Sequence, residues 1–378
     1  MNIRIVIHVL GILLMLEAVG LAVPFMISLH CGEKAASAFG ASILISLITG
    51  FCLSRIPVLH KKIKIRESFC IVSFGWILVS VIGALPFVFS GSIPSFIDAF
   101  FETVSGFTTT GATIVNDVES LPYGILFWRS FTHWIGGMGI LVFTLAILPA
   151  IGAGTFQIFK AEAPGPIADK IVPRIHDTAK VLYTTYIGFT LLEIILLKLG
   201  GMNLFESTLH TFGTVGTGGF STRNSSIGAY ENPYIHIVIS IFMILSGASF
   251  SLYYGLYKKK WREVFRHEEL RLYIAIITGS VLLIALNIHG SVYKSMKISI
   301  QHALFQVSSI ITTTGYATVD FNQWPIFSKA ILFVLLLLGG CAGSTAGGFK
   351  IIRSLILFKL IRREFLKLLH PRAIIHIK

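Results

Sequence analysis

Three short segments rich in Thr and Gly recur roughly one hundred residues apart, and they constrain the fold of this chain more than any other feature. The segments are Phe107–Thr113 (FTTTGAT), Thr214–Thr222 (TVGTGGFST) and Ile311–Thr318 (ITTTGYAT). They align on Gly111, Gly218 and Gly315. A single TTTG segment would indicate no more than a polar turn, but three of them at this spacing predict a repeated structural unit.

Each segment has the same neighbours. A long apolar span comes first, followed by an apolar run that is too short to cross a membrane and too apolar for a solvated loop. These short runs are Phe96–Gly106, Leu204–Gly213 and Ile300–Ile310. After each Gly, a polar stretch leads to a proline (Pro122, Pro233 or Pro325) near the start of another span, where proline is tolerated. The predicted unit is therefore span, half-helix, Thr/Gly loop, span.

Composition places these units in a membrane. Apolar residues make up 54% of the 378 positions and charged residues 13%, and the mean hydropathy is +0.79. A water-soluble domain of this composition would have a largely hydrocarbon surface, whereas a membrane-spanning helix needs about 20 apolar residues. We predict about eight spans, the first two forming a leading pair: Ile5–Leu29, Ala35–Ile56, Phe69–Phe89, Tyr123–Ile151, Val181–Leu199, Tyr234–Tyr257, Leu272–Ile288 and Phe327–Phe358.

The net charge of +13 reflects topology rather than nucleic-acid binding. Most basic residues fall in segments that the predicted spans place on one side of the membrane: the N-terminus, Arg55–Arg66, Lys160–Lys180, Lys258–Arg271 and Lys350–Lys378. Because basic loops stay cytoplasmic, both termini are expected there. Lys258–Arg262 indicates either an anchor to lipid headgroups or a surface for a regulatory partner.

The Thr/Gly loops predict a cation pore. Irregular backbone at membrane depth leaves carbonyl oxygens unsatisfied unless protein or water-borne ligands meet them. Arrays of such carbonyls replace the water around a potassium ion, glycine lets the backbone turn them inward, and threonine adds a hydroxyl oxygen. The TTTG and GTGG segments carry no charge, which favours fast passage over tight binding.

The last apolar span is interrupted by a glycine-rich segment. Five glycines in this segment oppose a continuous helix, so we predict a flexible loop below the filter. Its role is either a gate or close helix packing through small residues. The segment comprises Gly339, Gly340, Cys341, Ala342, Gly343, Ser344, Thr345, Ala346, Gly347 and Gly348.

Several polar residues within the spans are further candidates. Arg129 is predicted to support the first filter, with Glu102 as its partner, or else to extend toward the outer interface. His133 lies one turn from Arg129. Glu17 and Glu193 are expected to form no more than helix–helix hydrogen bonds. The four cysteines have no paired CxxC spacing, so no metal or redox site is expected.

With these segments in place, the chain resembles the Trk/Ktr/HKT superfamily of potassium transporters, and within it the bacterial TrkH-type subunits. The likeness covers nearly the whole chain. Besides the three loops it includes Phe127–Gly139 (FWRSFTHWIGGMG), Ala161–Pro166 (AEAPGP) and the highly specific Gly339–Arg353 (GGCAGSTAGGFKIIR).

The resemblance implies an all-α transmembrane fold of tandem helix–pore-helix–filter–helix repeats around a pseudo-fourfold pore. In this chain, residues 1–66 would form the leading helix pair and residues 67–160 the first repeat. Residues 161–265 would form the second repeat, and residues 266–378 the third repeat with the glycine-rich gating loop and a basic cytoplasmic tail.

The resemblance also implies potassium uptake across the bacterial inner membrane, driven by the membrane potential. The glycine-rich loop would be the gate, and a homodimer and a cytosolic nucleotide-binding regulatory ring would be the partners; neither a cofactor nor catalysis is expected. The ion would be met by carbonyls of Thr109, Thr110, Gly111, Gly216, Thr217, Gly218, Thr313, Thr314 and Gly315. One Gly per loop, rather than the two of TVGYG channels, predicts weaker discrimination against sodium.

Two points remain open in the sequence. The superfamily has four filter loops and this sequence shows three, so we expect that the chain alone does not conduct. The main alternative is an ion-coupled secondary transporter with discontinuous helices, which would carry inverted repeats, whereas these three units run in the same direction. A membrane-embedded enzyme is not favoured, since no HExxH or GxSxG segment is present.

Overall fold

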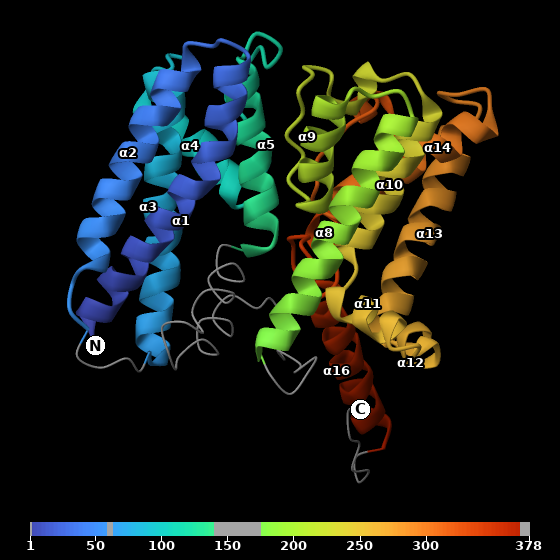
Figure 1. Cartoon of the computed structure of the whole chain (residues 1–378). Helices are drawn as coiled ribbons and strands as arrows, with labels where there is room; N and C mark the ends of the chain where they lie inside the picture. Colours follow the sequence, from blue (N-terminus) through green and yellow to red (C-terminus); the bar gives the residue numbers. More distant parts are fainter. Residues whose placement is uncertain (1, 59–62, 140–174, 371–378) are drawn as a thin grey trace.

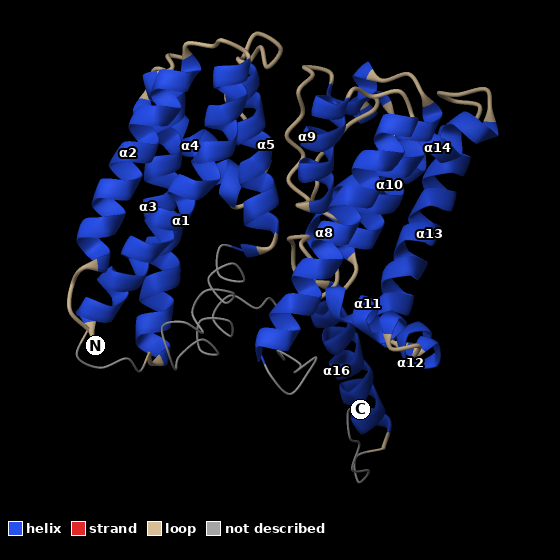
Figure 2. Ribbon diagram, in the orientation of Figure 1, coloured by secondary structure: helices blue, strands red, loops and turns tan. Residues whose placement is uncertain are grey.

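The computed structural model describes residues 2–58, 63–139 and 175–370, and this part of the chain is helical and contains no strand (Figures 1 and 2). The predicted Ala161–Pro166 segment, the second half of the predicted span Tyr123–Ile151 and the predicted boundary between the first and second repeats lie outside the described residues. The N-terminal group of helices comprises α1 (Ile3–His30), α2 (Ala35–Ser54), α3 (Ile65–Phe89), α4 (Phe96–Phe107) and α5 (Tyr123–Gly137).

The second group begins with α8 (Ile175–Leu199) and α9 (Leu204–Val215) and lies beside the first in Figure 1. Its remaining helices are α10 (Pro233–Gly247), α11 (Phe250–Tyr257), α12 (Trp261–Arg266), α13 (Glu268–Ile288), α14 (Met296–Ile311), α15 (Ile326–Leu338) and α16 (Ile351–Leu369). The predicted leading pair is confirmed, because α1 and α2 pack against each other.

The three predicted half-helices are confirmed as α4, α9 and α14. Ser95 and Asn203 cap the first two, each accepting a hydrogen bond from a backbone N–H in the first turn of its helix. Each half-helix packs against the long helix that precedes it, α3, α8 or α13. Two of the predicted prolines, Pro122 and Pro325, stand at the N-caps of α5 and α15, and Pro233 is the first residue of α10.

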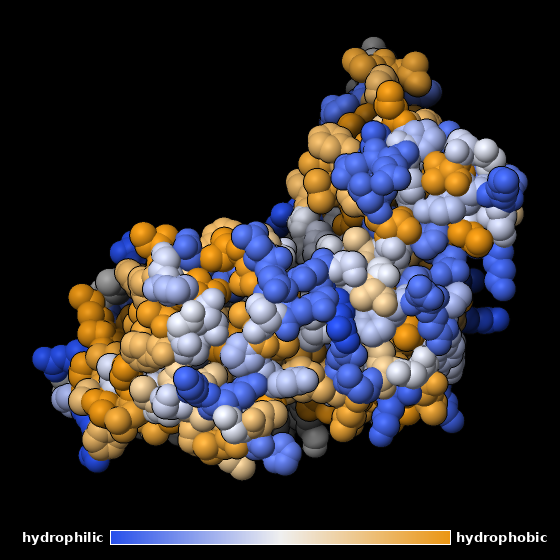
Figure 3. All heavy atoms as spheres, turned by 90° about the horizontal axis from the view of Figure 1, so that it is seen from above, coloured by the Kyte–Doolittle hydropathy of each residue, from blue (hydrophilic) through white to orange (hydrophobic). Residues whose placement is uncertain are grey.

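Five described helices are long and apolar enough to cross a membrane: α1, α2, α3, α8 and α13. Large apolar side chains such as Leu44, Leu191 and Leu286 are exposed on them, as lipid-facing surfaces require. Viewed from above, the end face of the molecule carries many hydrophilic side chains, with apolar side chains around much of its rim (Figure 3).

The prediction of one continuous span over Tyr234–Tyr257 is wrong. The helix ends at Gly247, and α10 and α11 meet at an angle of 93°. The N–H of Phe250 at this break donates to the carbonyl of Gly343 in the glycine-rich loop, at 3.0 Å. The predicted span Phe327–Phe358 is likewise divided, into α15, a loop and α16, as the glycines of that loop led us to expect. Both breaks are tolerated because protein groups satisfy the freed backbone.

Candidate functional site

The three Thr/Gly loops share one backbone conformation. Each follows the end of a half-helix and places a threonine at positive φ: Thr109 at 53°, Thr217 at 54° and Thr313 at 56°. Such values are uncommon for a residue with a branched side chain and indicate local strain that the surroundings maintain. Three matching strained positions identify the loops as equivalent elements.

The hydrogen bonds of the loops correct the sequence alignment of the second one. Thr110 N–H donates to the carbonyl of Ser105, the third-last residue of α4, and Gly218 N–H donates in the same way to Gly213, the third-last residue of α9. Gly218 is therefore the counterpart of Thr110, and the glycine at positive φ in the second loop is Gly219, at 81°. The Gly-Gly pair had allowed either register, and the alignment on Gly218 is off by one residue.

The loops face one another in sequence order. A Cβ built on Gly111 would lie 2.0 Å from the carbonyl oxygen of Gly218, and one built on Gly219 would lie 1.9 Å from that of Thr314. Only glycine fits at these contacts. A Cβ on Gly315 would meet no described atom within 4 Å, so the third loop has an open side where the first two have a neighbour.

The backbone carbonyls of the loops are left free. In the described part of the chain, the carbonyl oxygens of Thr109, Thr110, Thr217, Gly218, Thr313 and Thr314 accept no hydrogen bond, whereas the N–H groups of all six donate to the ends of the half-helices. Carbonyls that converge without protein donors are suited to hold a dehydrated cation.

His133 on α5 explains why the second loop carries glycines where the others carry threonines. A Cβ on Gly218 would lie 2.3 Å from the imidazole ring, and one on Gly216 would lie 2.5 Å from the carbonyl of His133. The imidazole Nδ1 accepts a long hydrogen bond of 3.4 Å from Phe220 N–H. In the first and third loops the corresponding threonine hydroxyls instead bond each other, Thr108 to Thr110 at 2.8 Å being one such pair.

The predicted pairing of Arg129 with Glu102 is present. Arg129 Nε donates to Glu102 Oε1 at 2.8 Å, and both side chains are buried. Glu102 also accepts from the hydroxyl of Thr113 and from Ile114 N–H, both directly after the first loop. The guanidinium carbon lies 4.3 Å from the ring centroid of Phe220 in the second loop. Arg129 therefore contacts the segments that follow two loops rather than extending to the outer interface.

His210 and Gln306 stand at the position of Glu102 on the other two half-helices, and their side chains also contact residues that follow the loop glycines. The sequence did not indicate this feature. His210 Nε2 lies 2.9 Å from the Ser221 hydroxyl, and Gln306 Nε2 donates to the carbonyl of Val319 at 3.4 Å. The three side chains differ in chemistry, so their equivalence becomes visible only when the half-helices are superposed on their ends.

Tyr316 joins the third loop to the second. Its hydroxyl lies 3.0 Å from the carbonyl of His210 and 3.1 Å from that of Phe220. Gly228 N–H donates a further backbone hydrogen bond to the carbonyl of Ala317, between the same two repeats. The loops are thus connected to one another and not only to their own helices.

The predicted glycine-rich loop lies against the ends of the second and third half-helices. Gly347 N–H donates to the hydroxyl of Thr313 at 2.7 Å, and the hydroxyl of Thr345 donates to the carbonyl of Val215, the last residue of α9, at 3.0 Å. Cys341 N–H donates to Gly247 at the break between α10 and α11. The glycine-rich loop therefore contacts Thr313 of the third Thr/Gly loop directly.

Glu269 on α13 links the glycine-rich loop to the first turn of α16, and nothing in the sequence indicated this role. Its Oε1 atom accepts from Ala342 N–H at 2.7 Å and from Ile352 N–H at 3.1 Å. The side chain is 3% exposed. Lys350, also buried, donates its Nζ to the carbonyl of Ala346 within the loop.

Of the remaining candidates, Glu193 interacts with Thr214 and Tyr316 of the loops. Glu17 and Glu193 are buried, but Glu17 has no hydrogen-bond partner among the described residues, so its expected helix–helix hydrogen bond is absent there. The four cysteines are free thiols. Within the described ranges, no three His, Cys, Asp or Glu side chains form a group that could hold a metal ion.

Comparison with known proteins identifies a family with these features. The TrkH family, described as a cation transport protein, matches residues 39–378. The Trk system potassium uptake protein TrkH of Escherichia coli K12 is 40% identical over all of this chain and 79% of its own length. TrkG of the same organism is 36% identical over all of this chain and 78% of its own length. The crystal structure of the potassium transporter TrkH from Vibrio parahaemolyticus superposes with a TM-score of 0.87 at 35% identity, covering all of this chain and 79% of that one.

Proposed function

Because this chain belongs to the TrkH family of cation transport proteins, we propose that it takes up potassium through a filter formed by its Thr/Gly loops. The observation that carries the proposal is the convergence of three equivalent loops whose carbonyls have no hydrogen-bond donors in the described part of the chain. An inside-negative potential contributes about 2.3 kcal/mol per elementary charge per 100 mV. That is enough for more than tenfold accumulation without a cofactor or a catalytic step.

The filter residues follow from the corrected register. We propose that the carbonyls of Thr109 and Thr110, Thr217 and Gly218, and Thr313 and Thr314 meet the ion. Gly111, Gly219 and Gly315 would allow the loops to approach one another, and the predicted Gly216 would belong to the helix end instead. The Arg129–Glu102 pair would keep the first loop in place without adding net charge beside the ion.

The pore requires a fourth wall on the open side of Gly315. Thr108 and Thr110 of the first loop and Gly315 of the third are more exposed than the buried second loop between them. Three loops placed in this order leave one quarter of a ring unfilled. We therefore propose that conduction occurs when a fourth element occupies that quarter.

The glycine-rich loop is proposed as the gate and Glu269 as its positioning residue. The loop contacts Thr313 of the proposed filter, and one carboxylate oxygen of Glu269 accepts from Ala342 N–H in the loop and from Ile352 N–H in α16. Displacing it would break contacts with α9, α10 and α13 together. Close packing through small residues accounts for the glycines, but it does not account for a buried carboxylate that binds both the loop and the first turn of α16.

Rubidium uptake by cells without their own potassium uptake tests the proposal. Two forms would be tested: the chain alone, and the chain joined to the part of the E. coli relative that the match leaves uncovered. We call the second form the completed chain. We expect uptake by the completed chain, reduced severely by Gly219→Ala and independent of a sodium or proton gradient. A requirement for a co-ion gradient would favour the ion-coupled transporter, and no uptake by either form would contradict the proposed function.

Localisation and partners form the finer part of this proposal. Candidate spans and the family support a membrane protein, and we propose the inner membrane with both termini cytoplasmic. A second copy and a nucleotide-binding regulatory ring are proposed partners, with α16 leading from the gate toward the ring. Crosslinking between two tagged copies would test the dimer. Accessibility of a cysteine placed at His370, measured from each side of the membrane, would test the orientation.

A further inference from the structure

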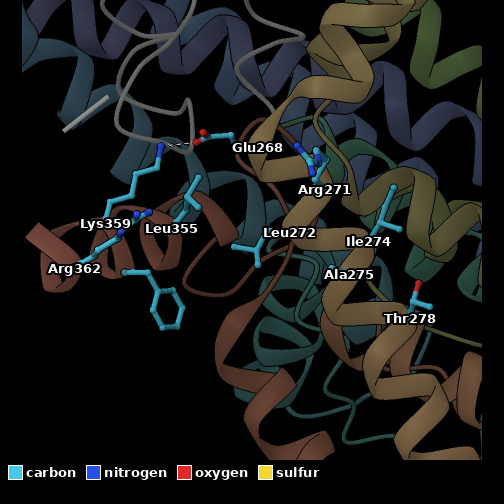
Figure 4. A pocket seen from close by; sticks show the side chains of 10 residues that line it. Glu268, Arg271, Leu272, Ile274, Ala275, Thr278, Leu355, Lys359 and Arg362 are labelled. Carbon is cyan, nitrogen blue, oxygen red and sulfur yellow. Dashed lines mark hydrogen bonds and ion pairs between the residues drawn. The ribbon is translucent and has the colours of Figure 1, made fainter. Parts of the chain in front are cut away.

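A groove with a volume of about 850 Å³ runs between α13 and α16 (Figure 4). Arg271 and Ile274 line it from α13, and Phe358, Lys359 and Arg362 line it from α16. Phe358 and Lys359 precede Arg362 by four and three positions, so all three lie on one side of that helix. The groove is thus built from two helix faces.

Both walls have the same polarity along the membrane normal. Helix α13 enters its apolar span from Glu268, so Arg271 lies nearer the surface and Ile274, 47% exposed, lies deeper. Helix α16 begins after the glycine-rich loop at Ile351 and runs toward the C-terminus at the bottom of Figure 1, away from the other helices. Phe358, 65% exposed, therefore lies deeper than Arg362. Each wall therefore places an exposed apolar side chain below a basic one.

The basic end of the groove carries a net positive charge, because its Arg and Lys side chains outnumber its one carboxylate. Lys359 forms an ion pair with Glu268 and holds the two walls together. Arg271 and Arg362 are exposed, and neither guanidinium forms an ion pair with a carboxylate among the described residues. Two guanidinium groups from opposite walls present forked donors that suit a phosphate.

We propose that this groove binds one anionic phospholipid. The phosphate would contact Arg271 and Arg362, and an acyl chain would lie along Ile274 and Phe358. Charge and polarity both match this amphiphile, and a basic pocket between helices at the cytoplasmic surface is a recognised setting for such lipids. A free anion would use the arginines but would leave the apolar half of the groove exposed.

Native mass spectrometry of the detergent-purified chain tests the site. Phosphatidylglycerol would be compared with phosphatidylcholine of the same acyl chains, in the wild type and in Arg271→Gln/Arg362→Gln. We expect a preference for phosphatidylglycerol that falls roughly tenfold or more in this double variant. Arg271→Lys/Arg362→Lys should retain most of the binding. This result distinguishes lost charge from a misfolded groove.

The matched control is Lys258→Gln/Arg262→Gln, which removes two exposed basic residues outside the groove, at the C-cap of α11 and on α12. These residues belong to the candidate headgroup anchor, so the control reports surface attraction of anionic lipid away from the groove. An equal loss in this control would mean general electrostatic attraction and overturn the site. Displacement of bound lipid by glycerol 3-phosphate at equal concentration would show a free-anion site instead. Unchanged lipid binding together with loss of a dimer in the groove variant would assign the groove to a second copy and overturn the proposal.

Discussion

Replacing Glu269 by alanine should release the glycine-rich loop. The substitution removes the one oxygen that accepts from both Ala342 N–H and Ile352 N–H. Hydrogen bonds to a charged group contribute about 1.5–3 kcal/mol each, so the lower figure for both gives about 3 kcal/mol. That corresponds to an increase of about two orders of magnitude in the ratio of displaced to docked loop.

Modification of Cys341 by a maleimide provides the assay. This thiol lies within the loop and is fully buried, so it reacts only when the loop is displaced. Replacing the other three cysteines by serine leaves it as the single reporter. We expect Glu269→Ala to raise the modification rate on the order of 100-fold. Glu269→Gln, which keeps an acceptor without its charge, should raise it on the order of tenfold.

Glu263→Ala is the control for this experiment, because Glu263, exposed on α12, forms its ion pair within the described ranges with Lys260 at the N-cap of the same helix. Surface pairs of this kind contribute little, so the Cys341 rate should not change. An unchanged rate in Glu269→Ala would refute the positioning role of the carboxylate. A rate that rose equally in Glu269→Gln and Glu269→Ala would show that the charge alone, rather than the pair of hydrogen bonds, holds the loop.

Three further predictions concern the filter. Arg129→Gln should lower the free energy of unfolding by about 3–5 kcal/mol because it leaves the Glu102 carboxylate buried and unpaired, and Arg129→Gln/Glu102→Gln should recover part of it in a thermal unfolding assay. Gly219→Ala should abolish rubidium uptake by the completed chain, whereas Gly290→Ala, at a similar φ of 80° but with no atom within 4 Å, should leave it near the wild-type value; equal effects would show that backbone strain rather than close approach matters. Tyr316→Phe removes both hydroxyl contacts to the second loop and should cost about 1–2 kcal/mol of unfolding free energy, with a larger sodium uptake relative to rubidium.

The elements were predictable where the signal was local. Apolar runs long enough to cross a membrane, half-length runs and the prolines near the start of the following spans gave the order of helices and the three loops. The break at Gly247 was not predicted, because Tyr234–Tyr257 is long and largely apolar and no proline marks it, although small and polar residues (Ser246–Ser251, SGASFS) stand at the break. The bend depends on Phe250 finding the carbonyl of Gly343, which lies far along the chain.

The candidate site was likewise predictable from the sequence only in part. Arg129 and Glu102 could be paired because each is a charge in an apolar helix and needs a partner. The register of the second loop could not be fixed, because Gly218 and Gly219 are identical in sequence and differ only in backbone conformation. Glu269 follows another acidic residue at the start of a helix, where a solvated carboxylate is the ordinary expectation, and only the folded loop reveals its role.

The Tyr316 hydroxyl has a consequence for how the opening could change size. Because it joins the third repeat to the backbone of the second, the diameter of the proposed filter would depend on the contacts between loops and not on any single loop. A substitution that removes the Tyr316 hydroxyl contacts would let the second and third loops move apart, even though the hydroxyl itself does not touch the ion in this proposal. Discrimination between cations of different radius would then be lost because the loops could move relative to one another, although every proposed coordinating oxygen would still be present.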